Sequence, residues 1–320
     1  MDFILSVTTF NRINYLKSCI NSWVDTRSEN ETWKLLIADD GSTDGTLNYL
    51  DQLSIDNCEI ITIKNNRIGV HQQMNTILHR LETISFDMCF KVDDDITFLK
   101  KGWDYLYLEQ AIKTGYDHLV FCDTNWCTEQ QIKEPIQEGG LIARTFIKNA
   151  HGFFYTITPQ ILKKVGYFDA DSFGFRGMGH VDFTMRCARA GFTSTNGPWD
   201  IVDSNNYICA SKENYQSVLK LSAITAYDEY NRVEKEEIIN QVDRIYIPLK
   251  KIDRFIYNSF QDELILALTN KVQNFEKEKG KEIYWYKNEI HKIKNWYESQ
   301  YDHLPNWFVK IGKLFKLLKQ

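Results

Sequence analysis

Short runs of β-branched and aromatic residues alternate with longer segments of helical period through the first half of the chain. The short runs predict β-strands at 3–9, 33–38, 59–64, 87–92 and 118–122, and the segments between them predict helices at 12–24, 44–53, 70–82 and 100–113. This alternation is typical of βαβ units, in which helices cover both faces of a mainly parallel sheet. The pattern therefore predicts an α/β fold.

The hydrophobic pattern changes twice further along the chain. From about residue 139 to 210 the sequence is rich in glycine and aromatic residues, with one more helical stretch at 180–191. After about residue 215 glycine and proline become scarce, and long charged segments of helical period follow. We therefore predict an α/β domain over residues 1–215 and a helical C-terminal region over residues 216–320.

Composition narrows the class of protein. The 320 residues are 43% hydrophobic and 25% charged, as in ordinary globular proteins, and the net charge of −5 disfavours nucleic acid as a partner. The seven cysteines include no C-x-x-C pair, which suits reduced cytoplasmic thiols better than a disulfide framework or a zinc site. The N-terminus lacks a basic segment before a long apolar run, so we expect no secretion signal and no transmembrane helix.

Polar residues follow each of the first four predicted strands. In open parallel sheets ligands bind beyond the carboxyl ends of the strands, where these residues would gather. They are Thr8, Thr9, Asn11 and Arg12 after the first strand, Asp39 and Asp40 after the second, Arg67 after the third, and Asp93, Asp94 and Asp95 after the fourth. A single cluster of this kind is also typical of a turn or a helix cap, but four in succession indicate a binding site.

The three consecutive aspartates carry the clearest chemistry. Adjacent carboxylates repel one another, so a cation is expected beside them. In an extended segment Asp93 and Asp95 share a face while Asp94 points away, and two carboxylates on one side suit Mn²⁺ or Mg²⁺. A solvated acidic turn is the alternative. The sequence contains neither a P-loop nor a G-x-G-x-x-G motif after the first strand, which disfavours P-loop NTPases and dinucleotide-dependent dehydrogenases.

Taken in order, "SVTTFNR", "IADDGSTDGT", "NNRIGVHQQMN" and "KVDDDI" resemble the nucleotide-sugar glycosyltransferases of the GT-A fold, in particular the large family two. The resemblance covers about residues 3–210 and includes "VGYFDADSFGFRGMGHVDFTMRCARAGF". It implies a GT-A domain with a helical C-terminal extension. It also implies sugar transfer, with inversion, from a UDP-sugar to a hydroxyl of an acceptor, assisted by Mn²⁺ or Mg²⁺.

The resemblance also implies roles for individual residues. Thr8 and Asp40 would contact the base and ribose, with Asp40 accepting a hydrogen bond from the pyrimidine. Asp95 would be the principal metal ligand of the D-x-D motif, and Asp93 the second ligand on the ribose side. The other residues expected to bind the donor are Phe10, Arg12, Arg67, Gly69 and Asp94.

The catalytic base departs from the family pattern. Inverting relatives usually carry an E-D pair ahead of a helical arginine, and the corresponding places before Arg186 hold Gly179 and His180. His180 can serve as base, because the unperturbed histidine pKa of about 6.5 lies near working pH. Asp182 is the other candidate, or it is a first-turn acid favoured by the helix dipole.

Three further residues are predicted on the acceptor side. They are His151 and Gly152 in "NAHGFFY" and Arg176 in the glycine-rich "SFGFRGMG", which is predicted to be a mobile loop that closes over the donor. A packed or hydrogen-bonded strand histidine is the alternative for His151.

The chain ends in "HLPNWFVKIGKLFKLLKQ", where apolar residues recur at helical spacing and four lysines lie largely elsewhere. This pattern is typical of an amphipathic helix on an anionic membrane surface. A helix docked on the catalytic domain or on a second copy of the chain, giving a homo-oligomer, is the alternative. Membrane contact would suit a lipid-linked glycan acceptor in surface polysaccharide synthesis, with the protein peripheral on the inner face of the plasma membrane.

Two other functions compete with sugar transfer. Sugar-phosphate nucleotidyltransferases share a similar sheet and metal-bound acids, but the first strand here leads into "TTFNR" instead of a glycine-rich, basic triphosphate loop. A non-catalytic, degenerate transferase that serves as an assembly partner is favoured only by the missing E-D pair.

Overall fold

The computed structural model describes residues 1–210 and 232–249. Residues 1–216 and 234–257 form one compact unit. Part of the region predicted as a helical tail therefore belongs to the same unit as the α/β domain. The predicted amphipathic helix at the C-terminal end, with its membrane or oligomer contacts, lies outside the described residues.

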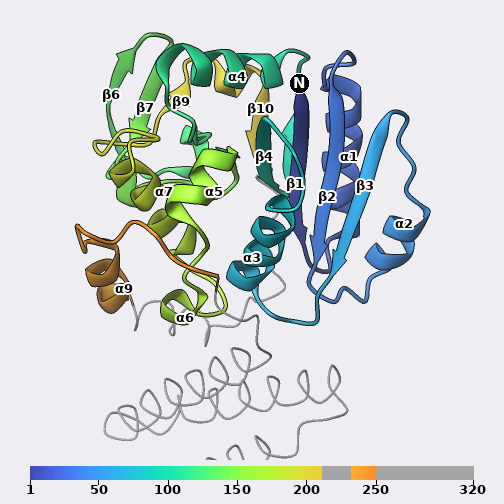
Figure 1. Ribbon diagram of the computed structural model, residues 1–320. Helices are drawn as coiled ribbons and strands as arrows, with labels where there is room; N and C mark the ends of the chain where they lie inside the picture. The colour runs from blue at the N-terminus through green and yellow to red at the C-terminus, as the bar shows by residue number, and fades with distance from the viewer. Residues whose placement is uncertain (211–231, 250–320) are drawn as a thin grey trace, which may run out of the picture. The chain divides into compact units, whose positions relative to one another are not determined.

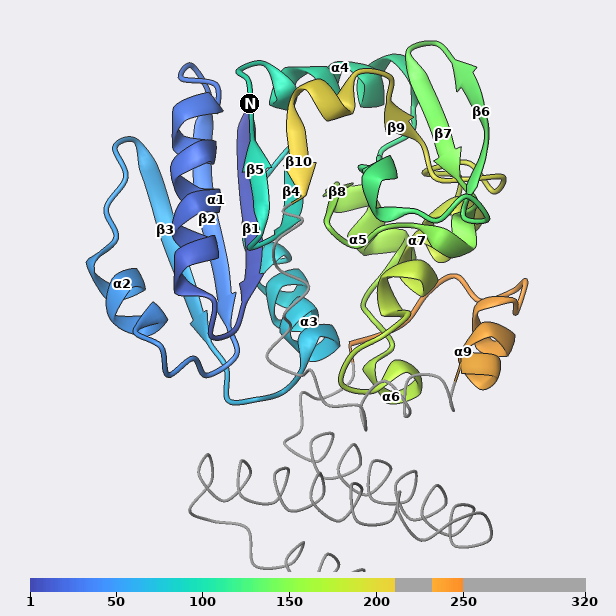
Figure 2. The same cartoon turned by 180° about the vertical axis from the view of Figure 1, so that it is seen from behind.

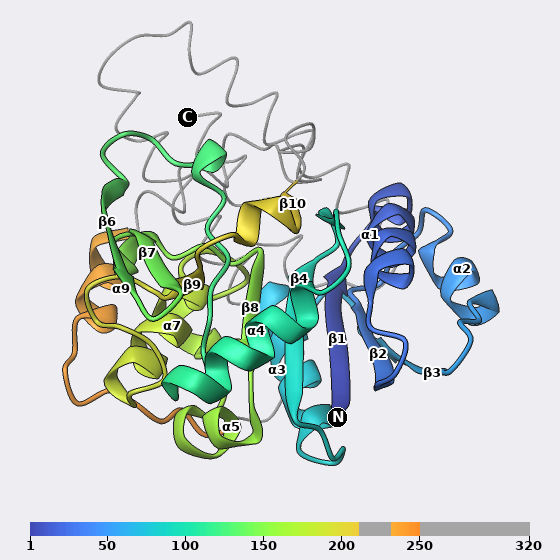
Figure 3. The ribbon, with the colours of Figure 1, turned by 90° about the horizontal axis from the view of Figure 1, so that it is seen from above.

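A five-stranded sheet in the order β3-β2-β1-β4-β8 forms the centre of this unit. Its parallel strands are β1 (Asp2–Thr9), β2 (Thr32–Asp39), β3 (Cys58–Lys64) and β4 (Met88–Asp93). At the edge, β8 (Phe154–Ile157) runs antiparallel to β4, and the view from above shows β1 between β2 and β4 (Figure 3). The parallel strands end together at the lower edge of the sheet in Figure 1, so the prediction of a mainly parallel sheet is confirmed.

Helices cover both faces of the sheet, as the alternating pattern predicted. One face packs against α1 (Ile13–Thr26), α2 (Thr46–Gln52) and α4 (Trp103–Thr114). The other packs against α3 (Val70–Leu81), α5 (Pro159–Val165) and α7 (Gly179–Arg189). Views from opposite sides show α3 in front of the sheet in Figure 1 and α1 in front of it in Figure 2.

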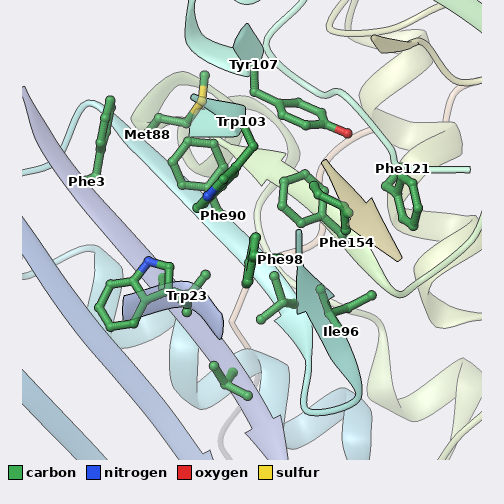
Figure 4. Packing of buried hydrophobic residues seen from close by; sticks show 14 of the residues in the cluster. Phe3, Trp23, Met88, Phe90, Ile96, Phe98, Trp103, Tyr107, Phe121 and Phe154 are labelled. Atoms are coloured by element: carbon green, nitrogen blue, oxygen red, sulfur yellow. The ribbon is translucent and has the colours of Figure 1, made fainter. Parts of the chain in front are cut away.

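Aromatic side chains fill the core beneath α1 and α4. Figure 4 shows Phe90, Trp103 and Phe154 at its centre, with Phe3 and Trp23 beside them. The rings of Phe90 and Trp103 lie 4.8 Å apart in a T-shaped arrangement, which aromatic quadrupoles favour. Because Phe90 precedes the aspartates by only a few residues in β4, this packing fixes the strand that carries them.

The second half of the unit contains short elements that the sequence did not predict. The strands β5 (Ile96–Phe98) and β10 (Ile208–Ala210) pair with each other, and β6 (Ile132–Glu138), β7 (Leu141–Thr145) and β9 (Asp200–Ile201) form a third sheet. The helix α6 (Ala170–Phe173) and short 3₁₀ turns at Thr124–Trp126, Ile147–Asn149 and Ser204–Asn206 complete this half.

The strand predicted at 118–122 is not a strand. The segment forms only an isolated bridge, between Val120 and Tyr155, although Phe121 N also donates to Phe154 O at 3.0 Å. The reason is that β8, from later in the chain, occupies the edge of β4 that this segment would otherwise have taken.

Residues 232–249 pack against α5 and α7. After α9 (Arg232–Ile239), the chain returns so that Ile247 bridges to Gly166, and its carbonyl accepts a hydrogen bond of 2.9 Å from Tyr167 N. Arg189 of α7 donates to the carbonyl of Arg244 at 3.1 Å. No helix within the described ranges is long and apolar enough to cross a membrane.

Candidate active site

The parallel register brings the predicted site residues to one edge of the sheet. Thr8 lies opposite Ala38 on one side and Asp93 on the other, and Thr9 lies opposite Asp39. Residues some 85 positions apart in sequence are therefore neighbours, as in the hydrogen bond from Thr9 to Asp94. The strand ends meet as the sequence pattern predicted.

Arg12 supplies the cation that the three aspartates require. Its two terminal nitrogens lie 2.8 Å from Asp94 Oδ1 and 2.6 Å from Asp95 Oδ2. Thr9 Oγ1 donates to Asp94 Oδ2 at 2.7 Å. Burial raises the pKa of Asp94 to about 7, although Arg12 opposes the shift. Asp94 is 2% exposed, so it anchors Arg12 and has no free surface for the donor contact that was predicted for it.

Asp93 and Asp95 are half-buried and remain open to a ligand. Asp93 pairs with Lys91, which lies two residues earlier on the same face of β4. Asp95 Oδ1 is buried without a hydrogen-bond partner among the described residues. Burial and the charge of Asp93 both raise the pKa of Asp95. An unpartnered carboxylate oxygen beside a second carboxylate fits a hard divalent cation.

Asp40 and Arg67 form a second charged group at the ends of β2 and β3. The Asp40 carboxylate accepts hydrogen bonds from the backbone of Ile68 at 2.7 Å and Gly69 at 3.0 Å, and Arg67 Nη1 lies 3.8 Å away. Burial raises the pKa of Asp40 to about 6. The Arg67 guanidinium lies 3.7 Å from the centroid of the Phe10 ring, a cation–π contact.

The glycine-rich loop after α6 packs onto this group. Val70 N donates to Phe175 O at 2.9 Å, and the Phe175 ring lies 5.2 Å from the Arg67 guanidinium. A Cβ at Gly69 would stand 2.6 Å from the Phe175 ring, and the Gly69 φ of +84° also disfavours other residues. The loop therefore lies against Arg67 and Gly69, with the half-buried Arg176 next in the chain.

Gly152, predicted to lie on the acceptor side, links His180 to the aspartates. Its carbonyl accepts a hydrogen bond of 2.6 Å from Lys91 Nζ, the same group that pairs with Asp93. A Cβ at Gly152 would lie 3.0 Å from His180 Cγ, so a glycine lets the imidazole approach. Burial, followed by the charge of Lys91, lowers the pKa of His180 to about 4. His180 is thus neutral at pH 7 and lies close to the Lys91–Asp93 pair.

Asp182 has a different environment from the one a base needs. It is 0% exposed, and its oxygens accept from Arg186 Nε at 2.8 Å and from Arg244 Nε at 3.0 Å. Both carboxylate oxygens are thus already bound by guanidiniums and do not face an acceptor hydroxyl. This geometry argues against the base role predicted for Asp182 and fits a structural ion pair.

His151, next to Gly152 in the chain, contacts a thiol. Its Nε2 is 3.3 Å from Cys127 Sγ, and its ring lies 4.8 Å from that of Phe153. The alternative of a packed or hydrogen-bonded histidine accounts for both the ring contact and the contact with the thiol.

Two residues of this region were not predicted. Lys91 could have been found, since a lysine two positions before Asp93 on a strand shares its face. Arg244 carried no local signal, because it lies beyond the predicted domain boundary and reaches Asp182 only through the fold.

Comparisons with known proteins agree with this geometry. The sequence matches the family model described as "Glycosyl transferase family 2" over residues 5–176, more than half of the chain. A curated relative, "Uncharacterized glycosyltransferase R363" of Acanthamoeba polyphaga mimivirus, is 24% identical over 201 residues, which are 63% of this chain and 75% of the relative.

The fold is also that of a solved mannosyltransferase. The mannosyltransferase PcManGT from Pyrobaculum calidifontis, solved with GDP-Man and Mn²⁺, superposes with a TM-score of 0.53 at 10% identity, covering 87% of this chain and 76% of its own. TarS of S. aureus, residues 1–349, gives a TM-score of 0.48 at 18% identity, covering 85% of this chain and 80% of its own.

Proposed function

The chain belongs to glycosyl transferase family 2 and is a glycosyltransferase, and we propose that it transfers a sugar from a UDP-sugar to a hydroxyl of a glycan with the help of Mn²⁺ or Mg²⁺. The observation that carries the proposal is the unpartnered Asp95 Oδ1 beside Asp93, at the edge of the sheet where the predicted nucleotide residues gather.

The carboxylates at the end of β4 suit a metal that also binds the donor. Asp95 and Asp93 are the proposed ligands, because both are half-buried and carboxylate oxygens are what Mn²⁺ and Mg²⁺ prefer. When bound, such an ion stabilises the negative charge that develops on the departing diphosphate. Arg12 and Lys91 hold the two carboxylates in position from the protein side.

The proposed nucleotide site lies beside the metal ligands. Asp40 is the proposed acceptor for the pyrimidine N–H, and with a pKa of about 6 it is mostly ionised at pH 7. Phe10 and Arg67, already in contact, offer a flat surface to the nucleotide. Because the Phe175 loop lies against Arg67 and Gly69, we propose that it moves when the donor enters and then closes over it.

We assign the base role to His180. Its imidazole is neutral at pH 7 and contacts the backbone of Ala150 and Gly177. To take the proton of an acceptor hydroxyl, a ring nitrogen would have to turn its lone pair away from these contacts. Its low pKa makes it a weak base in the absence of acceptor. Lys91 Nζ binds both the Asp93 carboxylate and the Gly152 carbonyl, and so holds the segment that carries Gly152 beside the carboxylate.

The acceptor and the pathway are proposed from the family resemblance. A glycan or a lipid-linked glycan in surface polysaccharide synthesis suits the predicted inverting chemistry. His151, Gly152 and Arg176 remain the proposed acceptor-side residues. Peripheral binding to the inner face of the plasma membrane, and assembly into a homo-oligomer, are proposed for the C-terminal region.

A thermal-shift screen tests the donor and metal. UDP with Mn²⁺ should raise the melting temperature, and a ligand at 100 times its Kd adds about 2.7 kcal/mol to folded-state stability. Asp95→Ala should lose the Mn²⁺-dependent part of the shift, whereas Asp25→Ala, on the exposed side of α1, should keep it. Stabilisation by nucleoside triphosphates alone would favour a nucleotidyltransferase instead.

Donor hydrolysis tests the base. His180→Ala should lower the rate by a factor of roughly 10² or more, the usual contribution of a positioned base. If His180→Ala keeps wild-type activity, and UDP with Mn²⁺ still raises its melting temperature, His180 is not the base.

A further inference from the structure

Two cysteines and a histidine from separate parts of the chain meet on the acceptor side of the molecule. Cys122 ends the extended segment beside β8, Cys127 follows the turn Thr124–Trp126, and His151 precedes β8. One ligand atom from each lies within 4.8 Å of the other two. Cys122 is buried, and Cys127 and His151 are half-buried, so the group lies near the surface.

The spacing of these atoms suits a tetrahedral zinc ion. Bonds of about 2.3 Å to sulfur and about 2.0 Å to nitrogen place neighbouring ligand atoms roughly 3.5–3.8 Å apart. Cys127 Sγ and His151 Nε2 are 3.3 Å apart, and no pair in the group exceeds 4.8 Å. Small side-chain movements would therefore complete the coordination.

The ligand types select zinc over the ions expected at the aspartates. Thiolate and imidazole bind Zn²⁺ well, whereas Mg²⁺ and Mn²⁺ prefer carboxylate and carbonyl oxygens. Two thiolates also balance the charge of a divalent ion, so a partly buried site would keep no net charge. Binding releases the two thiol protons to solvent.

His151 differs from the other buried histidines in what its ring does. His71 and His118 each place a ring nitrogen against a backbone carbonyl, at 2.7 and 3.0 Å, which is a structural role. His151 Nδ1 has no hydrogen-bond partner in the part of the chain that the structure describes, and Nε2 faces the thiol. Its imidazole is therefore held for the contact with the sulfur.

We propose that Cys122, Cys127 and His151 bind one zinc ion, with the fourth position open to water. The site is distinct from the hard-cation site at Asp93 and Asp95. It would fix the segment 151–153, where Gly152 O accepts from Lys91 and Phe153 O accepts from Asp93 N at 2.8 Å. The ion would thus support the loop that backs the aspartates.

Cobalt titration tests the proposal on the full chain, freed of any metal-binding tag and of metal, under reducing conditions. We expect one Co²⁺ per chain, with a near-ultraviolet sulfur-to-cobalt band and intense visible bands of tetrahedral cobalt, both removed by Zn²⁺. Cys127→Ser should abolish the sulfur band and His151→Gln should weaken binding at least tenfold. Cys58→Ser, a half-buried cysteine on β3, is the matched control and should bind as wild type does.

The outcomes that overturn the site need no sugar donor. A wild-type chain that shows no sulfur-to-cobalt band, or a Cys127→Ser variant that keeps it with unchanged affinity, refutes the site. A Cys122–Cys127 disulfide that persists under reductant, detected by intact mass after alkylation, refutes it as well. Since binding is measured with metal alone, the result is independent of the proposed sugar transfer.

Discussion

Two clusters of aspartates and arginines lie in this molecule, and they differ in what is left unpaired. At the end of β4, Arg12 pairs with Asp94 and Asp95, yet Asp95 Oδ1 has no partner among the described residues and the carboxylate is half-buried. In α7, Asp182 is completely buried, and Arg186 and Arg244 bind its two oxygens.

The comparison shows that charge pairing alone does not identify a functional site. Both clusters have acids at helix or strand ends, and both looked catalytic in the sequence. A buried ion pair whose oxygens are all bound is already complete and supports the fold. A half-buried carboxylate with an unpartnered oxygen can still bind a ligand, and this is the property that separates Asp95 from Asp182.

The largest loss of stability is expected at Asp182, because both of its oxygens are bound by guanidiniums. Asp182→Ala leaves the buried Arg186 guanidinium without a carboxylate, while Arg244 keeps its pair with Asp169 at 2.6 Å. The change should lower the free energy of unfolding by about 3–5 kcal/mol, measured by urea denaturation. Asp25→Ala, exposed on α1, is the control and should change it by less than about 0.5 kcal/mol. If Asp182→Ala loses no more unfolding free energy than Asp25→Ala, the distinction between the two clusters is wrong.

Asp95→Ala should lower activity strongly and change stability little, which is the opposite of what is expected for Asp182→Ala. Losing a metal ligand should reduce sugar transfer by a factor of about 100, or about 2.7 kcal/mol in activation free energy. Stability should change little, because the carboxylate is half-buried and repelled by Asp93. The measurements are released UDP per minute and the melting temperature. A variant that transfers sugar normally in chelator-treated buffer with added Mn²⁺ contradicts the metal assignment.

Asp94 in the first cluster should make stability fall as pH rises, whereas His71, His118 and His180, whose pKa values burial lowers to about 4, act in the opposite direction. Unfolded, Asp94 ionises near pH 4, but in the folded protein its pKa is about 7. Between these values the folded state holds more protons, so the free energy of unfolding falls as pH rises, by at most about 1.4 kcal/mol per pH unit. Asp94→Asn should flatten this slope in denaturation curves between pH 4.5 and 7; the unchanged slope would assign it to other groups.

The smallest effect is expected from Gly152→Ala. The added Cβ would lie 3.0 Å from His180 Cγ, so the imidazole must shift by a few tenths of an ångström. We expect kcat to fall by a factor of about 3–10, or about 1 kcal/mol, while the thermal shift with UDP and Mn²⁺ stays at the wild-type value. A reduced shift with unchanged kcat would assign Gly152 to the donor side.

The fold of the first half could be predicted because local pattern and tertiary structure agree there. Runs such as 3–9 and 33–38 lie within β1 and β2, and the GT-A fold expected from the ordered motifs is confirmed. Beyond residue 93 the strands have two to seven residues and pair across long separations, as β5 does with β10. Such short strands carry too few alternating positions for a pattern to be seen.

The site could be predicted where one residue type implied one chemistry, as for the aspartates. The partners of those residues could not, since Arg12 meets Asp95 across 83 positions and Arg244 meets Asp182 across 62. The zinc ligands were missed for a related reason. Cys122 and Cys127 are not spaced as a C-x-x-C pair, and the third ligand, His151, follows Cys127 by 24 residues and reaches it only through the fold.

Residues 240–249 have a practical consequence for anyone who expresses this enzyme in pieces. A stop codon after residue 215, where the composition changes, would delete Ile247 from its pairing with Gly166 and Tyr167, and one of the two guanidiniums that hold Asp182. In the truncated chain Gly166 and Tyr167 would lose their backbone partner, and the buried Asp182 would keep only Arg186. A minimal recombinant transferase therefore has to extend at least through Ile247.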